Sequence, residues 1–186
     1  IDRIEQAGIV ARDGTKASID TLVLATGFDM WEKNIPAIEI IGRDGVTLTE
    51  KWADGVRTFH GLHVHGFPNC FIESIAQSGF TVNFPYLIDT QSRHVAWLIA
   101  HALQRDLAAL EATADAEQQW VDAVVARSDV IAGRRESCTP GYYNREGQAN
   151  DRLRQDSFFF GSPTEYGDIL ATWREVGALE GLNAIP

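Results

Sequence analysis

The chain has 186 residues and a formal net charge of −10, and 45% of its residues are hydrophobic and 23% charged. This composition is that of an ordinary globular protein, and its acidic balance disfavours nucleic acids and anionic membrane surfaces, because both need clustered Lys and Arg. No apolar run approaches the ~20 residues that a membrane span needs. The two cysteines, Cys70 and Cys138, form no spacing motif, and free thiols of this kind favour a reducing cytoplasm.

The first half of the chain indicates two hairpins. Residues 3–11 and 15–25 flank an Asp-Gly pair, and Asp-Gly between apolar runs is a strong hairpin signal because glycine tolerates positive φ. The second arm contains Ile19–Ala25, whose continuous apolar character predicts a buried strand. A second hairpin is predicted with its arms at residues 38–41 and 46–48. Because the chain begins without Met inside the first of these arms, we expect a truncated protein.

The second half is predicted to be mainly helical. A loop-rich stretch leads to a short strand at residues 70–75. Apolar residues at helical spacing predict a helix over about 81–104, and capping patterns predict helices over about 115–131 and 162–177. Residues 138–161 form a long loop rich in Gly, Tyr and Arg, and a loop of that length suggests a function.

The sequence contains no G-x-G-x-x-G and no P-loop pattern. These are the motifs that cradle a pyrophosphate, so any nucleotide contact made by this chain is expected to be supplementary. His60, His63 and His65 raise the alternative of a metal site. No carboxylate or cysteine completes a convincing ligand set, so we expect no metal.

Three segments in order carry a resemblance to a known family. The first is Asp20–Asp29, an apolar strand that ends in Ala-Thr-Gly-Phe. The second is His65–Phe71, with Gly-Phe-Pro-Asn at its centre, preceded by Trp52-x-x-Gly55 and Phe59-x-Gly61. The third is Cys138–Gly147. Alone, the first segment is equally well an ordinary core strand, but together the three resemble the Baeyer–Villiger type of flavin-dependent monooxygenase over about residues 4–180.

The resemblance implies an α/β fold, the C-terminal fragment of a flavoprotein with two dinucleotide-binding domains. Residues 1–34 would be a β-meander with the strand that returns to the FAD domain. Residues 35–112 would be the C-terminal part of the FAD domain, and residues 113–186 a helical extension that carries an active-site loop. The N-terminal portion of the same protein, which would bind FAD and NADPH, would be missing from this sequence and would act as its partner.

The resemblance also implies site residues on two sides. In the family, the start of the helix after residue 80 abuts the flavin ring, and a helix N-terminus offers unpaired N–H groups and positive potential. The expected cofactor-binding residues are Gln77, Ser78, Thr81, Val82 and Asn83, with simple helix capping as the alternative for Thr81 and Asn83.

On the substrate or nicotinamide side the expected residues are Tyr142, Tyr143 and Asn144, and ordinary packing is the alternative for the two tyrosines. The family's loop carries a tryptophan here, whereas this sequence has none between Trp120 and Trp173. We expect no residue of this chain to act as acid, base or nucleophile.

As part of an intact enzyme, the resemblance implies that NADPH reduces FAD and that O₂ adds to give a flavin C4a-peroxide. This peroxide would attack a small-molecule ketone and yield an ester or lactone, with the reactive atoms belonging to the cofactor. The alternatives are a flavin enzyme that oxygenates nitrogen or sulfur, or a truncated, non-catalytic piece that acts at most as an interaction module. The isolated fragment is expected to be inactive.

Overall fold

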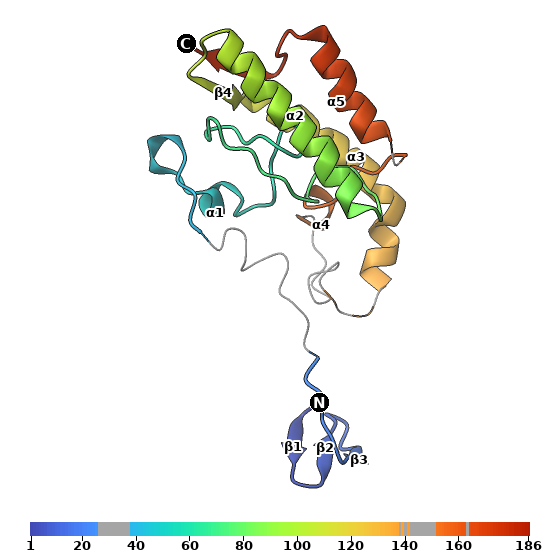
Figure 1. The fold of residues 1–186 in the computed structure, drawn as a ribbon. Helices are drawn as coiled ribbons and strands as arrows, with labels where there is room; N and C mark the ends of the chain where they lie inside the picture. Colours follow the sequence, from blue (N-terminus) through green and yellow to red (C-terminus); the bar gives the residue numbers. More distant parts are fainter. Residues whose placement is uncertain (26–37, 138, 140, 142–151, 163) are drawn as a thin grey trace.

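The computed structural model describes residues 1–25, 38–137, 139, 141, 152–162 and 164–186 (Figure 1). It combines two small antiparallel sheets with three long helices. This agrees with the expected α/β class of helices and small strands. The division of the chain at residues 34 and 112 stays a prediction.

The first sheet has the strand order β1-β2-β3, formed by Arg3–Glu5, Gly8–Val10 and Lys16–Ser18. The predicted Asp-Gly hairpin is confirmed, because Val10 pairs with Lys16 and Gly14 turns the chain at φ +85°. The predicted buried strand Ile19–Ala25 is wrong. These residues form no strand, and the side chains of Val23 and Leu24 are 77% and 75% exposed.

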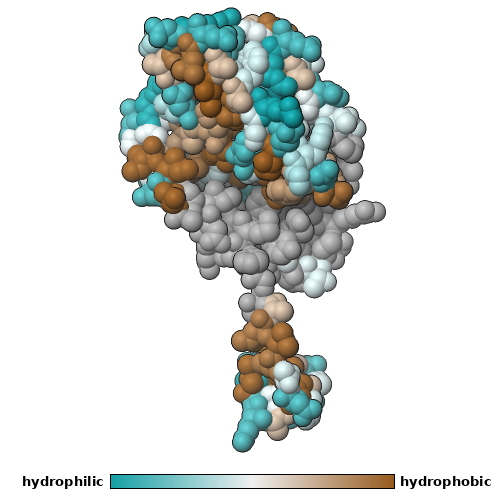
Figure 2. Space-filling model, in the orientation of Figure 1, coloured by the Kyte–Doolittle hydropathy of each residue, from teal (hydrophilic) through white to brown (hydrophobic). Residues whose placement is uncertain are grey.

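Residues 19–25 form no buried strand because no other strand or covering side chains lie next to them in the described part of the chain. A buried strand needs hydrogen-bond partners and covering side chains, and the described part of the chain supplies neither next to residues 19–25. Figure 2 shows the resulting apolar surface close to the first sheet. The Thr26-Gly27-Phe28 end of this segment lies outside the described residues.

The second predicted hairpin is present in reduced form. A single antiparallel bridge joins Ile41 to Thr47 around the short 3₁₀ helix Arg43–Gly45. Thr47 then caps helix α1, Leu48–Lys51, with a reciprocal pair of hydrogen bonds to Glu50. The second arm therefore passes into a helix at Leu48, because the capping pair satisfies the first N–H groups locally.

The predicted strand at residues 70–75 is also wrong, since only Phe71 makes a bridge, to His63. The sequence analysis missed a sheet made of β4, Ala109–Ala112, and β5, Leu182–Ile185, which pair antiparallel. Strands this short carry too little periodic pattern to be found when their partner is some 70 residues away.

The three long helices are confirmed. Helix α2 spans Phe84–Gln104, α3 spans Ala114–Ser137 and α5 spans Glu165–Val176, while the short α4 covers Arg152–Gln155. Helix α5 lies beside α2, with α3 behind them (Figure 1). None of the described helices is long and apolar enough to cross a membrane.

The largest core cluster joins these helices to the loops around residues 59–62 and 159. Its central member is Trp120 of α3, which stacks on Phe159 with ring centroids 4.8 Å apart and an interplanar angle of 8°. The other buried members are Phe59, Leu62, Leu87, Ala112, Ala116, Val124, Tyr166 and Leu170. This core fixes the segment that leads into α2.

Candidate functional site

The segment that leads into α2 is held from several sides, and Gln77 is its centre. The side chain of Gln77 is fully buried. Its Oε1 accepts from the backbone N–H of Thr58 at 2.8 Å and from the hydroxyl of Thr58 at 2.6 Å. Its Nε2 donates to the carbonyls of Val56 at 2.7 Å and Gln155 at 2.9 Å. Two lone pairs and two N–H groups are all that a carboxamide offers, so this side chain is saturated inside the protein.

Ser78 and Gly79 continue this restraint. The hydroxyl of Ser78 donates to the carbonyl of Ser74 at 2.6 Å, and its own carbonyl accepts from the N–H of Phe159 at 2.8 Å. Gly79 forms a parallel bridge with Phe159. A Cβ atom on Gly79 would lie 2.7 Å from Cβ of Tyr166, so only glycine fits against α5 here.

The next residues emerge at the surface. Asn83 is the N-cap of α2: its Oδ1 accepts from the N–H of Tyr86 at 3.2 Å, while its own N–H donates to Oγ1 of Thr81 at 3.0 Å. Val82 is 99% exposed, and the rings of Phe80 and Phe84 are 46% and 49% exposed. The start of α2 is therefore an apolar surface, although its approach is tightly packed.

The surface at the start of α2 combines unpartnered backbone N–H groups with exposed apolar side chains. Among the described residues, none accepts a hydrogen bond from the N–H of Val82 or Phe84. The free N–H of Phe84, the first residue of the 21-residue helix, and that of Val82, just before the N-cap, favour an electron-rich acceptor. The apolar side chains favour a ring beside it. A group with hydrogen-bond acceptors beside an apolar ring would meet both requirements, and the predicted flavin is a group of this kind.

Replacing Asn83 with alanine is expected to lower the free energy of unfolding by about 1 kcal/mol, because the cap of α2 loses its side-chain acceptor. Asn83→Asp keeps an acceptor at the same place and should lose less. Thermal denaturation of both variants beside the wild type measures the difference. An equal loss in the two variants would contradict the capping role.

The structure thus separates the five predicted flavin-side residues into two groups. Gln77 and Ser78 are buried and bonded within the chain, whereas Thr81, Val82 and Asn83 lie at the start of α2. Whether any of the five contacts a cofactor stays a prediction. The predicted substrate-side residues Tyr142, Tyr143 and Asn144 lie outside the described residues.

Three buried histidines form a cluster behind this segment. His60 and His94 have ring centroids 6.0 Å apart, and those of His63 and His94 are 6.4 Å apart. Burial lowers the pKa of His63 to about 4 and that of His94 to about 3, and it lowers the pKa of His60 in the same direction. The sequence analysis missed His94, which reaches the cluster from α2.

The histidine cluster has an unusual hydrogen-bond pattern. Arg174 donates to Nδ1 of His94 at 3.0 Å, while Nδ1 of His60, Nε2 of His63 and Nε2 of His94 find no partner among the described residues. Within the same part of the chain, no group of three or more His, Cys, Asp or Glu residues could hold a metal ion.

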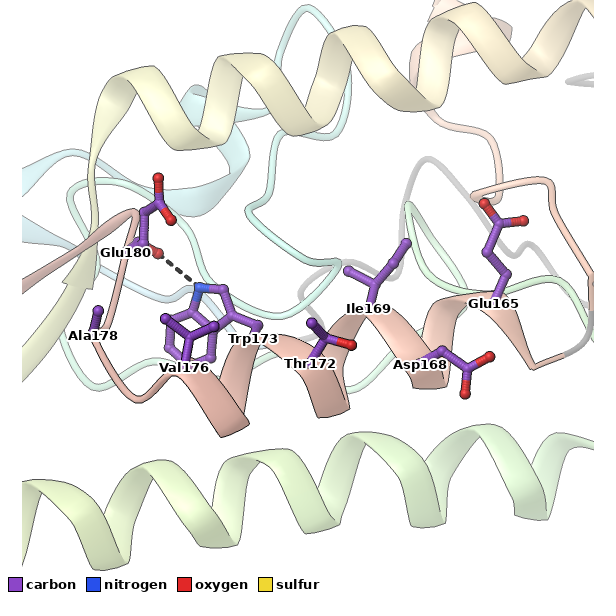
Figure 3. Close-up of a pocket in the computed structure, with 8 residues that line it drawn as sticks. All are labelled: Glu165, Asp168, Ile169, Thr172, Trp173, Val176, Ala178 and Glu180. Carbon is purple, nitrogen blue, oxygen red and sulfur yellow. Dashed lines mark hydrogen bonds between the residues drawn. The ribbon is translucent and has the colours of Figure 1, made fainter.

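A groove of about 470 Å³ runs along α5 and the turn after it (Figure 3). Apolar side chains such as Ile169 and Val176 line it together with Asp168, and the indole N–H of Trp173 donates to the carbonyl of Glu180 at 2.8 Å. Of the predicted site residues that the structure describes, none lines this groove.

Comparison with known proteins extends over almost the whole chain. No protein-family model matches. The chain is 40% identical to neopentalenolactone D synthase of Streptomyces avermitilis, 37% to an FAD-binding monooxygenase of Hypomyces subiculosus and 35% to Baeyer–Villiger monooxygenase 4 of a Dietzia species. Each match covers 98% of this chain and 30–31% of the relative.

Over nearly its whole length, this chain is similar to about a third of the length of Baeyer–Villiger-type and FAD-binding monooxygenases. The resemblance inferred from the three sequence segments is thereby confirmed. The chain spans about a third of the length of the curated relatives that it matches.

Solved structures of monooxygenases agree with this similarity. The polycyclic ketone monooxygenase of Thermothelomyces thermophila matches with a TM-score of 0.81 and 31% identity, over 98% of this chain and 30% of that chain. An oxidized steroid monooxygenase bound to NADP matches with a TM-score of 0.77 and 29% identity, over 98% and 33%.

Proposed function

We propose that the whole protein is an FAD- and NADPH-dependent monooxygenase that inserts one oxygen atom of O₂ into a ketone to give an ester or lactone. The observation that carries this proposal is the match of 98% of the chain to relatives that include a Baeyer–Villiger monooxygenase. The FAD-binding relative and the NADP-bound structural neighbour support the two cofactors. The structural neighbours polycyclic ketone monooxygenase and cyclohexanone monooxygenase support a ketone substrate.

This chain would supply one edge of the flavin site. Thr81, Val82 and Asn83 would face the isoalloxazine ring, with the free N–H groups of Val82 and Phe84 directed at its electron-rich edge. Positive potential at the start of α2 stabilises negative charge there. When bound, FAD supplies the transfer of electrons from NADPH and the activation of O₂.

Other parts of the site would be shared between this chain and the rest of the protein. Tyr142, Tyr143 and Asn144 are proposed to lie on the substrate or nicotinamide side. The sequence has no Gly-rich phosphate-binding loop, so the pyrophosphates of both cofactors would be held elsewhere in the whole protein. We therefore propose that the isolated chain is inactive. A cytoplasmic location stays a prediction.

The proposal is tested with the full-length protein, purified and incubated with NADPH, O₂ and cyclohexanone or a polycyclic ketone. We expect a yellow protein whose NADPH consumption rises with the ketone and that forms a lactone. Oxidation of a thioether to a sulfoxide without any lactone would favour the nitrogen- or sulfur-oxygenating alternative. A colourless protein without ketone-dependent turnover would contradict the proposal.

A further inference from the structure

We propose that Gln77 is a positioning residue that couples the C-terminal segment Gln155–Phe159 to the start of α2. This inference rests on the proposed function, in which Thr81, Val82 and Asn83 face the flavin. It assigns Gln77 a role through its neighbours, since its saturated side chain has no donor or acceptor left for a cofactor.

Gln77 joins three separate parts of the chain. Its side chain binds the 56–58 loop and the carbonyl of Gln155. Its backbone N–H donates to the carbonyl of Ser157 at 2.8 Å, and its backbone carbonyl accepts from the indole N–H of Trp120 at 2.9 Å. Every polar group of the residue is therefore used, on both its side chain and its backbone.

The backbone of Gln77 is also strained into one geometry. It has a φ of +56°, in the left-handed region that a residue other than glycine occupies only when its surroundings impose it. Gly61 makes room for this geometry, because a Cβ atom there would lie 2.8 Å from the carbonyl oxygen of Gln77. The backbone at Gln77 therefore cannot shift without breaking these contacts.

Contacts of residues 78–80 extend the restraint from Gln77 toward the start of α2 at Phe84. Ser78 and Gly79 are tied to Phe159 in the same C-terminal segment, and Tyr166 closes against Gly79. Phe80 then contacts Phe158 and Phe160, with ring centroids 5.2 Å from each. A shift of the segment 155–160 therefore moves residues 77–80, and with them the two N–H groups proposed to face the flavin.

Two matched variants of Thr58 test this role in the full-length, FAD-loaded protein. Thr58→Val has a similar volume but lacks the hydroxyl, which donates to Oε1 of Gln77 and accepts from the N–H of Gly61, whereas Thr58→Ser keeps this hydroxyl. Gln77→Glu is a stronger change, because a carboxylate cannot donate to the carbonyls of Val56 and Gln155. The measurements are the visible circular dichroism of bound FAD, kcat and KM for the ketone, and the melting temperature.

We expect Thr58→Val and Gln77→Glu to change the flavin spectrum and to lower kcat by about tenfold, because a small misplacement of a reacting group is costly. The ketone KM should stay within roughly twofold, and Thr58→Ser should behave like the wild type. Variants that melt earlier but keep the flavin spectrum and kcat would overturn the coupling and leave Gln77 a purely structural residue. A wild type that binds no FAD and shows no ketone-dependent turnover would overturn the proposed function and the coupling together.

Discussion

Replacing Trp120 with alanine is expected to lower the free energy of unfolding by about 3–5 kcal/mol, the largest effect we expect from a single substitution. The indole is 7% exposed and lies in the largest core cluster, stacked on Phe159 and edge-on to His60 at 5.0 Å. Alanine would leave a cavity between α3 and the C-terminal segment. It would also leave the buried carbonyl of Gln77 without its donor.

Trp120→Phe separates these two contributions. Phenylalanine keeps a ring against Phe159 but lacks the indole N–H, so its loss should be about 1–3 kcal/mol and smaller than that of alanine. Urea denaturation of the three proteins, followed by far-ultraviolet circular dichroism, gives the comparison. An alanine variant within about 1 kcal/mol of the wild type would show that this stacking contributes little to stability.

Acidification is expected to destabilise the protein through the three buried histidines. In the unfolded chain a histidine takes up a proton near pH 6.5, whereas burial lowers the folded pKa of His63 to about 4 and that of His94 to about 3. Between these values the unfolded state binds more protons, so stability falls as the pH falls. Each of these histidines can contribute up to about 1.4 kcal/mol per pH unit.

The pH range over which stability is lost follows from the same pKa values. Stability from these residues is fully present above pH 6.5 and decreases below it, until the folded pKa of each residue is reached. The pKa of His60 is lowered by burial first and then by His94 and His63, so it adds to the loss in the same direction. Arg174, whose guanidinium donates to His94, opposes a second positive charge there.

His63→Phe tests this account, because it removes one titrating ring from a site that already packs edge-on against Phe71 at 5.3 Å. The slope of unfolding free energy between pH 6 and about pH 4 should become shallower by about 1.4 kcal/mol per pH unit. Leu103→Ala, at a side chain 76% exposed, is the control and should leave the slope unchanged. An unchanged slope in His63→Phe would contradict the assignment of the acid sensitivity to this cluster.

The sequence by itself determined the helices and the family. Helices α2, α3 and α5 follow from contiguous patterns, such as the apolar stripe of α2 and the reciprocal hydrogen bonds between Ser162 and Glu165 before α5. The Asp-Gly turn between β2 and β3 likewise follows from a contiguous pattern. Such signals involve residues that interact within a few positions, so a single sequence contains both partners.

Only the tertiary structure decided which elements find partners. Ile19–Ala25 has the composition of a buried strand, yet residues 20–25 are exposed, because no neighbouring strand lies beside them in the described part of the chain. Strands β4 and β5 pair across some 70 residues with little pattern of their own. The distinction between the buried Gln77 and the exposed Val82 likewise depends on Thr58, Trp120 and Gln155, which are distant in sequence. Contacts of this kind follow from how the core closes, and that closure depends on packing between segments rather than on the preference of any one of them.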